Sequence, residues 1–172
     1  GNLWLSTNQG ICKFDPVKKT FRKYDASDGL QGNEFSQNVV CKGRRGKLFF
    51  GGTNGITTFF PDQVTDNPFI PPIVITDFKK FNQSVSLETS ITETQEILLD
   101  YTENFITFEF AALNFTNARR NQFAYRLIGF DDHWIPAGTQ RSATFTNLDG
   151  GTYTFQVKGS NNDGVWNETG AS

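Results

Sequence analysis

The sequence is poor in the side chains that most catalytic and metal sites use. Its 172 residues include one histidine, His133, two cysteines, Cys12 and Cys41, and no methionine. A structural zinc site needs four clustered nitrogen or sulfur ligands, which these residues do not supply. We therefore expect no metal, no cofactor and no catalytic residues. Both cysteines lie in strand-like runs, where a buried free thiol is favoured and a disulfide is the alternative.

The sequence also has no large excess of either charge and no long apolar run. It has 16 basic and 18 acidic residues, so its net charge is −2. This balance gives no reason to expect binding to nucleic acid or to an anionic membrane surface. No apolar run approaches the roughly 20 residues of a membrane helix. No charged leader opens the chain, so we expect any signal peptide to be absent or removed.

Aromatic residues are plentiful, and many of them alternate with polar ones. Phenylalanine alone occurs 18 times. Tyr153, Phe155 and Val157 fall on one side of an extended segment, and similar alternation runs through residues 123–127. This period of two predicts half-buried antiparallel strands, and the Asp/Asn/Gly clusters between them predict turns. Residues 125–166 therefore predict a β-sandwich.

Further strands are predicted upstream, at residues 72–81, 96–100 and 105–113, with a turn at residues 82–84. An immunoglobulin-like sandwich has about seven strands, and we count about six after Pro72. The missing strand is expected to follow Trp166, so the sandwich is predicted at residues 71–172, lacking its last strand. Prolines near the boundary, Pro68, Pro71 and Pro72, stiffen a short linker and prevent strand pairing there. We place the domain boundary near Ile70.

Residues 1–70 contain an internal repeat. GNLWLSTNQGICKFDP, from Gly1, aligns without a gap on GKLFFGGTNGITTFFP, from Gly46, an offset of 45 residues. This period suits a four-stranded propeller blade, which takes roughly 40–50 residues. Strands are predicted at residues 2–7, 10–14, 20–25 and 35–42, followed by the repeated hairpin. Fewer than two blades are present, whereas a closed ring needs about four to eight. We expect either a piece of a longer protein or edges covered by a second copy.

The two halves resemble two consecutive modules of one protein family. G-x-L-W-x-x-T-x-x-G-I-x-x-F-D-P, followed by F-x-x-Y and Gly29–Leu30, resembles the propeller repeat of two-component regulators. F-x-Y-x-L-x-G-x-D-x-x-W, G-x-Y-x-F-x-V and N-x-x-G-x-W resemble the Y_Y_Y domain that follows these repeats. Tyr125 and Tyr153 occupy two tyrosine positions, and Phe145 stands where a tyrosine is common. The chain thus resembles the periplasmic sensor region of a Bacteroides-type hybrid histidine kinase.

The resemblance implies a sensory function without enzymatic activity in this part of the chain. It implies the membrane-proximal end of a periplasmic sensor of an inner-membrane protein. The sandwich would dimerise and relay oligosaccharide detection to an adjoining transmembrane helix, the chain's only link to the membrane. The alternative is a carbohydrate-binding or adhesive accessory domain of a secreted protein.

Several residues have the chemistry of a site, and for each a structural role is favoured. Asp131, Asp132, His133 and Trp134 form the most tempting cluster, but they are typical of a solvated turn. The sequence shows no catalytic carboxylate pair among Glu88, Glu93, Glu103 and Glu109. Sugar rings could stack on three tryptophans, and anionic sugars could meet two arginine pairs: Trp4, Trp134, Trp166, Arg44–Arg45 and Arg119–Arg120. The ligand-binding residues remain unknown at this point.

Two further predictions concern hydroxyl and amide side chains. Leu148, Gly150, Gly151 and Tyr153 resemble a tyrosine corner, in which the tyrosine hydroxyl bonds back to the backbone and braces a loop. Asn-x-Ser/Thr triplets begin at Asn82, Asn114 and Asn167. This motif is short and frequent by chance, so glycosylation is not expected.

Overall fold

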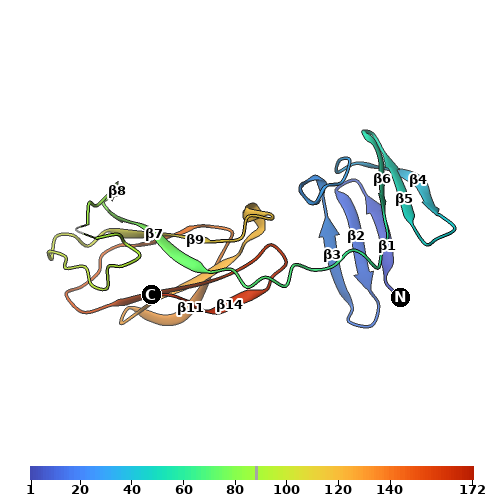
Figure 1. The fold of residues 1–172 in the computed structure, drawn as a ribbon. Coiled ribbons are helices and arrows are strands. Elements are labelled where there is room, and N and C mark those ends of the chain that lie inside the picture. The colour runs from blue at the N-terminus through green and yellow to red at the C-terminus, as the bar shows by residue number, and fades with distance from the viewer. Residues whose placement is uncertain (88) are drawn as a thin grey trace. The chain divides into compact units, whose positions relative to one another are not determined.

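The computed structural model describes residues 1–87 and 89–172 and is built from antiparallel β-sheets (Figure 1). The chain divides into two compact units, Gly1–Asp66 and Asn67–Ser172. The all-β prediction is confirmed. The division precedes the predicted boundary at Ile70, because residues 67–71 are hydrogen-bonded to the second unit. None of the helical turns in the described part of the chain is long or apolar enough to cross a membrane.

The first unit contains two three-stranded antiparallel sheets, in the orders β1-β2-β3 and β4-β5-β6. A 3₁₀ turn, η1 (Ala26–Asp28), lies between them in sequence. The strands of the first unit are β1 (Leu3–Thr7), β2 (Gly10–Asp15), β3 (Thr20–Tyr24), β4 (Phe35–Lys42), β5 (Leu48–Gly52) and β6 (Gly55–Phe59). These bounds agree closely with the strands that the repeat predicts.

The two copies of the repeat form hairpins of the same register. Leu3 pairs with Phe14 at the open end of the first hairpin, and Leu48 pairs with Phe59 in the second. Gly10 and Gly55 begin the return strands with φ angles of 117° and 124°. Only glycine adopts this backbone region without strain, which explains why both copies keep it.

Aromatic rings join the two sheets of the first unit. The Trp4 ring lies 4.7 Å from Phe59 and 5.5 Å from Tyr24, measured between centroids. Phe50, which is 1% exposed, also stacks on Phe59, with ring centroids 5.9 Å apart. Cys12 is half-buried and Cys41 is exposed, and both thiols are free. The expectation of buried thiols is therefore wrong for Cys41.

The second unit is a sandwich of two four-stranded sheets, ordered β11-β10-β13-β14 and β12-β9-β7-β8. A 3₁₀ turn, η2 (Ala118–Arg120), precedes β10. The strands of the second unit are β7 (Ile73–Lys80), β8 (Gln83–Ser84), β9 (Ile106–Ala112), β10 (Phe123–Ile128), β11 (Asp131–Gly138), β12 (Ser142–Phe145), β13 (Thr154–Ser160) and β14 (Trp166–Ala171).

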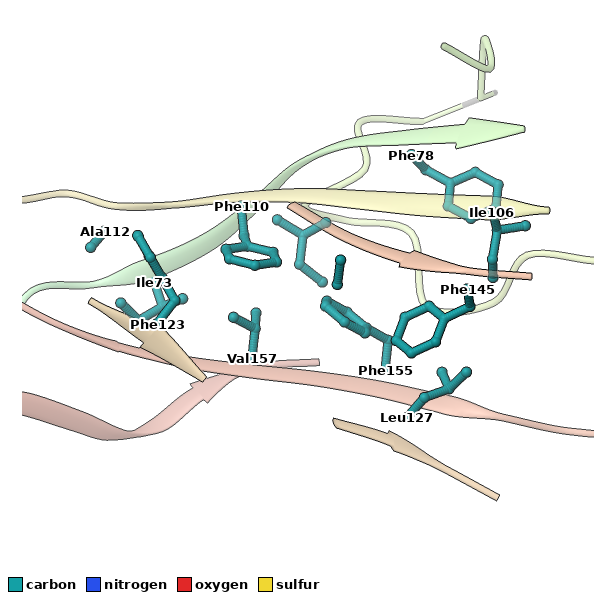
Figure 2. Packing of buried hydrophobic residues seen from close by; sticks show 12 residues of the cluster. Ile73, Phe78, Ile106, Phe110, Ala112, Phe123, Leu127, Phe145, Phe155 and Val157 are labelled. Atoms are coloured by element: carbon teal, nitrogen blue, oxygen red, sulfur yellow. The ribbon is translucent and has the colours of Figure 1, made fainter. Parts of the chain in front are cut away.

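The core fills the space between these two sheets (Figure 2). Phe110 and Ile106 of β9 point toward Phe155 and Val157 of β13, and Val157 is fully buried. Phe145, at a position where tyrosine is common, is 5% exposed. An apolar ring suits this dry site, because a buried hydroxyl would need a partner.

Several predictions of strands and turns differ from the structure, and Asp131–Trp134, expected in a turn, belong to β11 (Asp131–Gly138). Residues 96–100 form no strand; Ile97 packs against the core, whereas Leu98 is 86% exposed, so the alternation of a half-buried strand is missing. The turn predicted at residues 82–84 lies at Phe81 and Asn82, whose positive φ angles of 49° and 63° permit a tight hairpin into β8. The strand expected to be missing after Trp166 is present as β14.

Candidate functional site

Trp134 and Trp166 lie on the outer face of the β11-β10-β13-β14 sheet. On β13, Phe155 and Val157 point into the core, so Lys158 points outward. The Lys158 Nζ atom lies 4.7 Å from the centroid of Trp134 and 5.7 Å from that of Trp166. The structure thus brings together two of the three candidate tryptophans, with one ammonium group near both. We call this surface the Trp134–Lys158 face.

Hydrogen bonds orient the two cationic side chains of the Trp134–Lys158 face, Arg126 and Lys158. The Arg126 guanidinium lies 4.7 Å from the Trp134 ring centroid, and its Nε and Nη2 donate to Gln156 Oε1 at 2.9 and 2.7 Å. Lys158 Nζ donates to Glu168 Oε2 at 2.7 Å. Cations over an aromatic ring are attracted by its π-electrons. They cover ring surface that a sugar would otherwise stack on.

Trp4 is placed differently. Its half-buried ring packs against Tyr24 and Phe59 in the first unit, with Lys13 Nζ 5.8 Å from its centroid. This contact joins two sheets, so the side chain acts as a structural brace.

Asp131 and His133 lie at the start of β11, immediately after the Gly129–Phe130 turn. Asp131 Oδ1 accepts hydrogen bonds from the His133 backbone at 3.0 Å and contacts its Nδ1 at 2.9 Å. The backbone bond, followed by the ring bond, lowers the pKa of Asp131 below its ordinary value. The His133 side chain is 94% exposed, so this cluster lies in water.

Two of the four glutamates considered as catalytic candidates form ion pairs with lysines of β7. Glu103 accepts from Lys80 Nζ at 2.6 Å, and Glu109 accepts from Lys79. The pKa of Glu103 is lowered, chiefly by the Lys80 bond and then by the Asp100 amide. The bond that Lys79 donates to Glu109 raises the pKa of Lys79. Glu93 lies in an exposed loop, and Glu88 lies outside the described residues.

The arginine pairs lie on separate units. Arg44 and Arg45 are exposed in the turn between β4 and β5, and Arg119 and Arg120 belong to η2. Among residues 1–87 and 89–172, no group of three or more histidine, cysteine, aspartate or glutamate side chains could hold a metal ion.

A shallow hollow of about 430 Å³ lies along β7, β9 and β12, lined by Thr76, Glu109, Phe110, Ala111, Arg141 and Ser142. Its charged groups are engaged, since Glu109 pairs with Lys79 and Arg141 Nη2 donates to the Ala118 carbonyl at 2.7 Å. It has no charged group directed at a ligand.

The predicted tyrosine corner is present. The Tyr153 hydroxyl donates to the Asp149 carbonyl at 2.9 Å. It closes the loop between β12 and β13, as a brace rather than a proton donor.

Asparagines at one end of the sandwich form a network that the sequence patterns did not reveal. The Asn67 and Asn114 side-chain amides both donate to Asn162 Oδ1, at 3.1 and 3.0 Å. Asn114 also donates to Asn121 Oδ1 at 2.9 Å, and it is only 3% exposed. This burial is incompatible with glycosylation of Asn114 in the folded chain.

The same network holds the segment that enters the sandwich. Asn161 Nδ2 donates to the carbonyls of Asn67 and Phe69, both at 2.7 Å. Asn167 Nδ2 donates to the Pro71 carbonyl at 2.9 Å. The N-x-x-G-x-W motif contains Asn161, but nothing in it indicates a backbone partner more than 90 residues away.

Comparisons with known proteins agree with this architecture. Residues 114–172 match the Y_Y_Y domain family. The chain is 39% identical, over 175 aligned residues and 97% of its length, to histidine kinase P4 of Formosa agariphila. It matches the extracellular domain of the B. thetaiotaomicron protein BT3049, described as a hybrid two component system, with a TM-score of 0.80, 34% identity and 98% of this chain covered. The resemblance to sensor regions of hybrid two-component histidine kinases is thereby confirmed.

A more distant structure shows the same fold. The extracellular domain of B. thetaiotaomicron BT4673 matches 97% of the chain with a TM-score of 0.52 and 24% identity. The chain spans 13% of the length of histidine kinase P4, 23% of the BT3049 chain and 22% of the BT4673 chain. It corresponds to one segment of much longer proteins.

Proposed function

We propose that this chain is the membrane-proximal part of a periplasmic sensor of a hybrid histidine kinase. The first unit contributes blades to a β-propeller, and the sandwich relays oligosaccharide detection through dimerisation to an adjoining transmembrane helix. This part of the protein is a sensory module without enzymatic activity. The helix anchors the protein in the inner membrane.

One observation carries the proposal: both units of this chain, in sequence, match a single extracellular domain of a hybrid two component system. That match extends over 98% of the chain at 34% identity. The equal register of the two repeat hairpins supports blade-like packing of the first unit. Each of its sheets has three strands, whereas a complete blade has four, so neighbouring blades would supply the remainder.

A relay needs two arrangements that the ligand stabilises unequally. Dimerisation supplies such a pair, because the free energy of ligand binding can favour one arrangement of two sandwiches over another. The asparagine network supports the proposal, since a stiff connection transmits a displacement that a soft one absorbs.

The Trp134–Lys158 face favours a second candidate, a carbohydrate-binding accessory module. A sugar would have to displace Arg126 and Lys158 from the Trp134 ring, and an acidic sugar would then pair with the displaced cations. The two candidates predict different locations for the ligand. A sensor binds it mainly through the propeller, whereas an accessory module binds it through this chain alone.

Sedimentation and calorimetry distinguish these candidates. The intact extracellular region is expected to bind an oligosaccharide and to change its sedimentation coefficient, whereas the 172-residue chain alone is expected not to bind. Binding by the chain alone, lost in Trp134→Ala, would favour the accessory module. An intact region that stays monomeric and binds none of the oligosaccharides tested would contradict the sensor.

A further inference from the structure

Side-chain amides donate hydrogen bonds to every second carbonyl of the segment 67–71. The carbonyls of Asn67 and Phe69 accept from Asn161, and that of Pro71 accepts from Asn167. In an extended chain alternate carbonyls point the same way, so one row of donors can reach all three. Asn161 follows β13 and Asn167 belongs to β14, so the segment is attached to the β13–β14 hairpin.

Proline explains why side chains make this attachment. Pro68, Pro71 and Pro72 have no backbone N–H, so the segment cannot pair as an ordinary strand. Its carbonyls still need donors where they approach the sandwich, and carboxamides supply them. The first available N–H, that of Asn67, donates to Asp163 Oδ2 at 2.6 Å.

The two donor amides are themselves fixed. Asn161 is fully buried, and its Oδ1 accepts from the Asp163 and Val165 amides at 2.8 and 3.0 Å. Asn167 Oδ1 accepts from the Thr169 and Gly170 amides, each at 3.1 Å. Because the backbone donors occupy the oxygens, the NH₂ groups must face the entering segment.

The residue before this segment belongs to the other unit. The Asp66 carboxylate pairs with Arg22 of β3. Asp66 is thus bonded to the first unit, and Asn67 is bonded to the second. Asn161 and Asn167 connect this segment directly to the β13–β14 hairpin.

We propose that Asn161 and Asn167 are positioning residues that couple the entering segment to β14 and thereby transmit the signal. This inference rests on the proposed sensor function and names the contacts through which the sandwich receives the displacement. Neither residue needs to touch the ligand.

Asparagine-to-aspartate substitutions separate coupling from turn structure. Asn161→Asp and Asn167→Asp keep the oxygen that accepts from the neighbouring amides, but lose the NH₂ that donates to the segment. Asn167→Asp removes only one bond, and its side chain is half-buried. This variant therefore provides the test if Asn161→Asp prevents folding. Tyr153→Phe is the matched control, since it also removes one side-chain-to-carbonyl bond, outside this network.

Hydrogen exchange of the intact extracellular region tests the attachment. Peptides that span residues 64–72 are expected to exchange faster in both aspartate variants and at the wild-type rate in Tyr153→Phe. Unchanged exchange in both variants would overturn the inference.

Autophosphorylation of the full-length receptor tests the coupling. We expect its response to an oligosaccharide to fall about fivefold or more in the aspartate variants, with unchanged ligand affinity. A full response from a variant with a loosened segment would overturn the inference. A wild type that ignores every oligosaccharide contradicts the proposed function instead. In that case the coupling is measured as the rate of autophosphorylation without ligand. An unchanged rate in both variants would overturn the inference.

Discussion

The rings of Phe108 and Phe155 stack across the sandwich, with centroids 4.1 Å apart and planes 3° from parallel. Phe108 belongs to β9 and Phe155 to β13, so the pair joins the two sheets. Phe155 also lies within 6.3 Å of Phe110, Tyr125 and Phe145. Phe155 therefore contacts aromatic rings from both sheets.

Phe155→Ala is expected to destabilise the sandwich by about 3–5 kcal/mol, because it removes a buried ring and leaves a cavity. Urea denaturation followed by circular dichroism measures this loss. Leu98→Ala is the control, since Leu98 is 86% exposed and its truncation should change the free energy of unfolding by less than about 0.5 kcal/mol. Equal effects of the two substitutions would contradict the assigned core.

Tyr153→Phe is expected to cost about 0.5–1.5 kcal/mol, the usual worth of one hydrogen bond. The ring stays, so only the bond to the Asp149 carbonyl is lost. The same denaturation experiment measures the change. Tyr101→Phe, at a ring that is 88% exposed, should be neutral. A neutral Tyr153→Phe would show that the corner does not brace the loop.

Local patterns predicted the parts of the fold that local chemistry determines. The alternation of Tyr153, Phe155 and Val157 predicted β13 and its buried face, and the repeat predicted two hairpins of equal register. Residues 96–100 misled the prediction, because three consecutive apolar residues suggested a strand although only Ile97 packs on the core. In that loop the tertiary contacts, rather than the propensity, decide the conformation.

The candidate site was harder to predict, since its contacts join distant parts of the chain. Trp134 and Trp166 were identified as candidates, but only the order of the strands places them near the same lysine. The bond from Asn161 to the Phe69 carbonyl joins residues 92 positions apart, and asparagines in a turn usually bond to their own loop. No periodicity in a single sequence encodes such a pair.

The Lys80–Glu103 pair makes stability depend on pH. The bond from Lys80 lowers the pKa of Glu103 below its unfolded value. A lowered carboxyl pKa stabilises the folded state above the unfolded pKa, and the stabilisation is lost as the pH falls through the folded value. Glu103→Gln should therefore be less stable than wild type at neutral pH, and this difference should shrink as the medium becomes acidic.

Denaturation midpoints at a series of pH values from neutral to acidic measure this difference. Glu96→Gln, at an exposed position of the same connection, is the matched control for loss of one negative charge. If the two variants show the same pH dependence, general charge rather than the Lys80 bond is responsible. Added salt should weaken the effect, since both side chains remain partly exposed.

A double-mutant cycle tests the Trp134–Lys158 contact. Trp134→Leu and Lys158→Gln each remove one partner of a cation–π pair with an Nζ-to-centroid distance of 4.7 Å. We expect a coupling free energy of about 0.5–1 kcal/mol for this partly exposed pair. A parallel cycle of Trp134→Leu with Thr154→Ala, an exposed residue at the other end of β13, should be additive. Coupling in that second cycle, or none in the first, would show that Lys158 does not act through the ring.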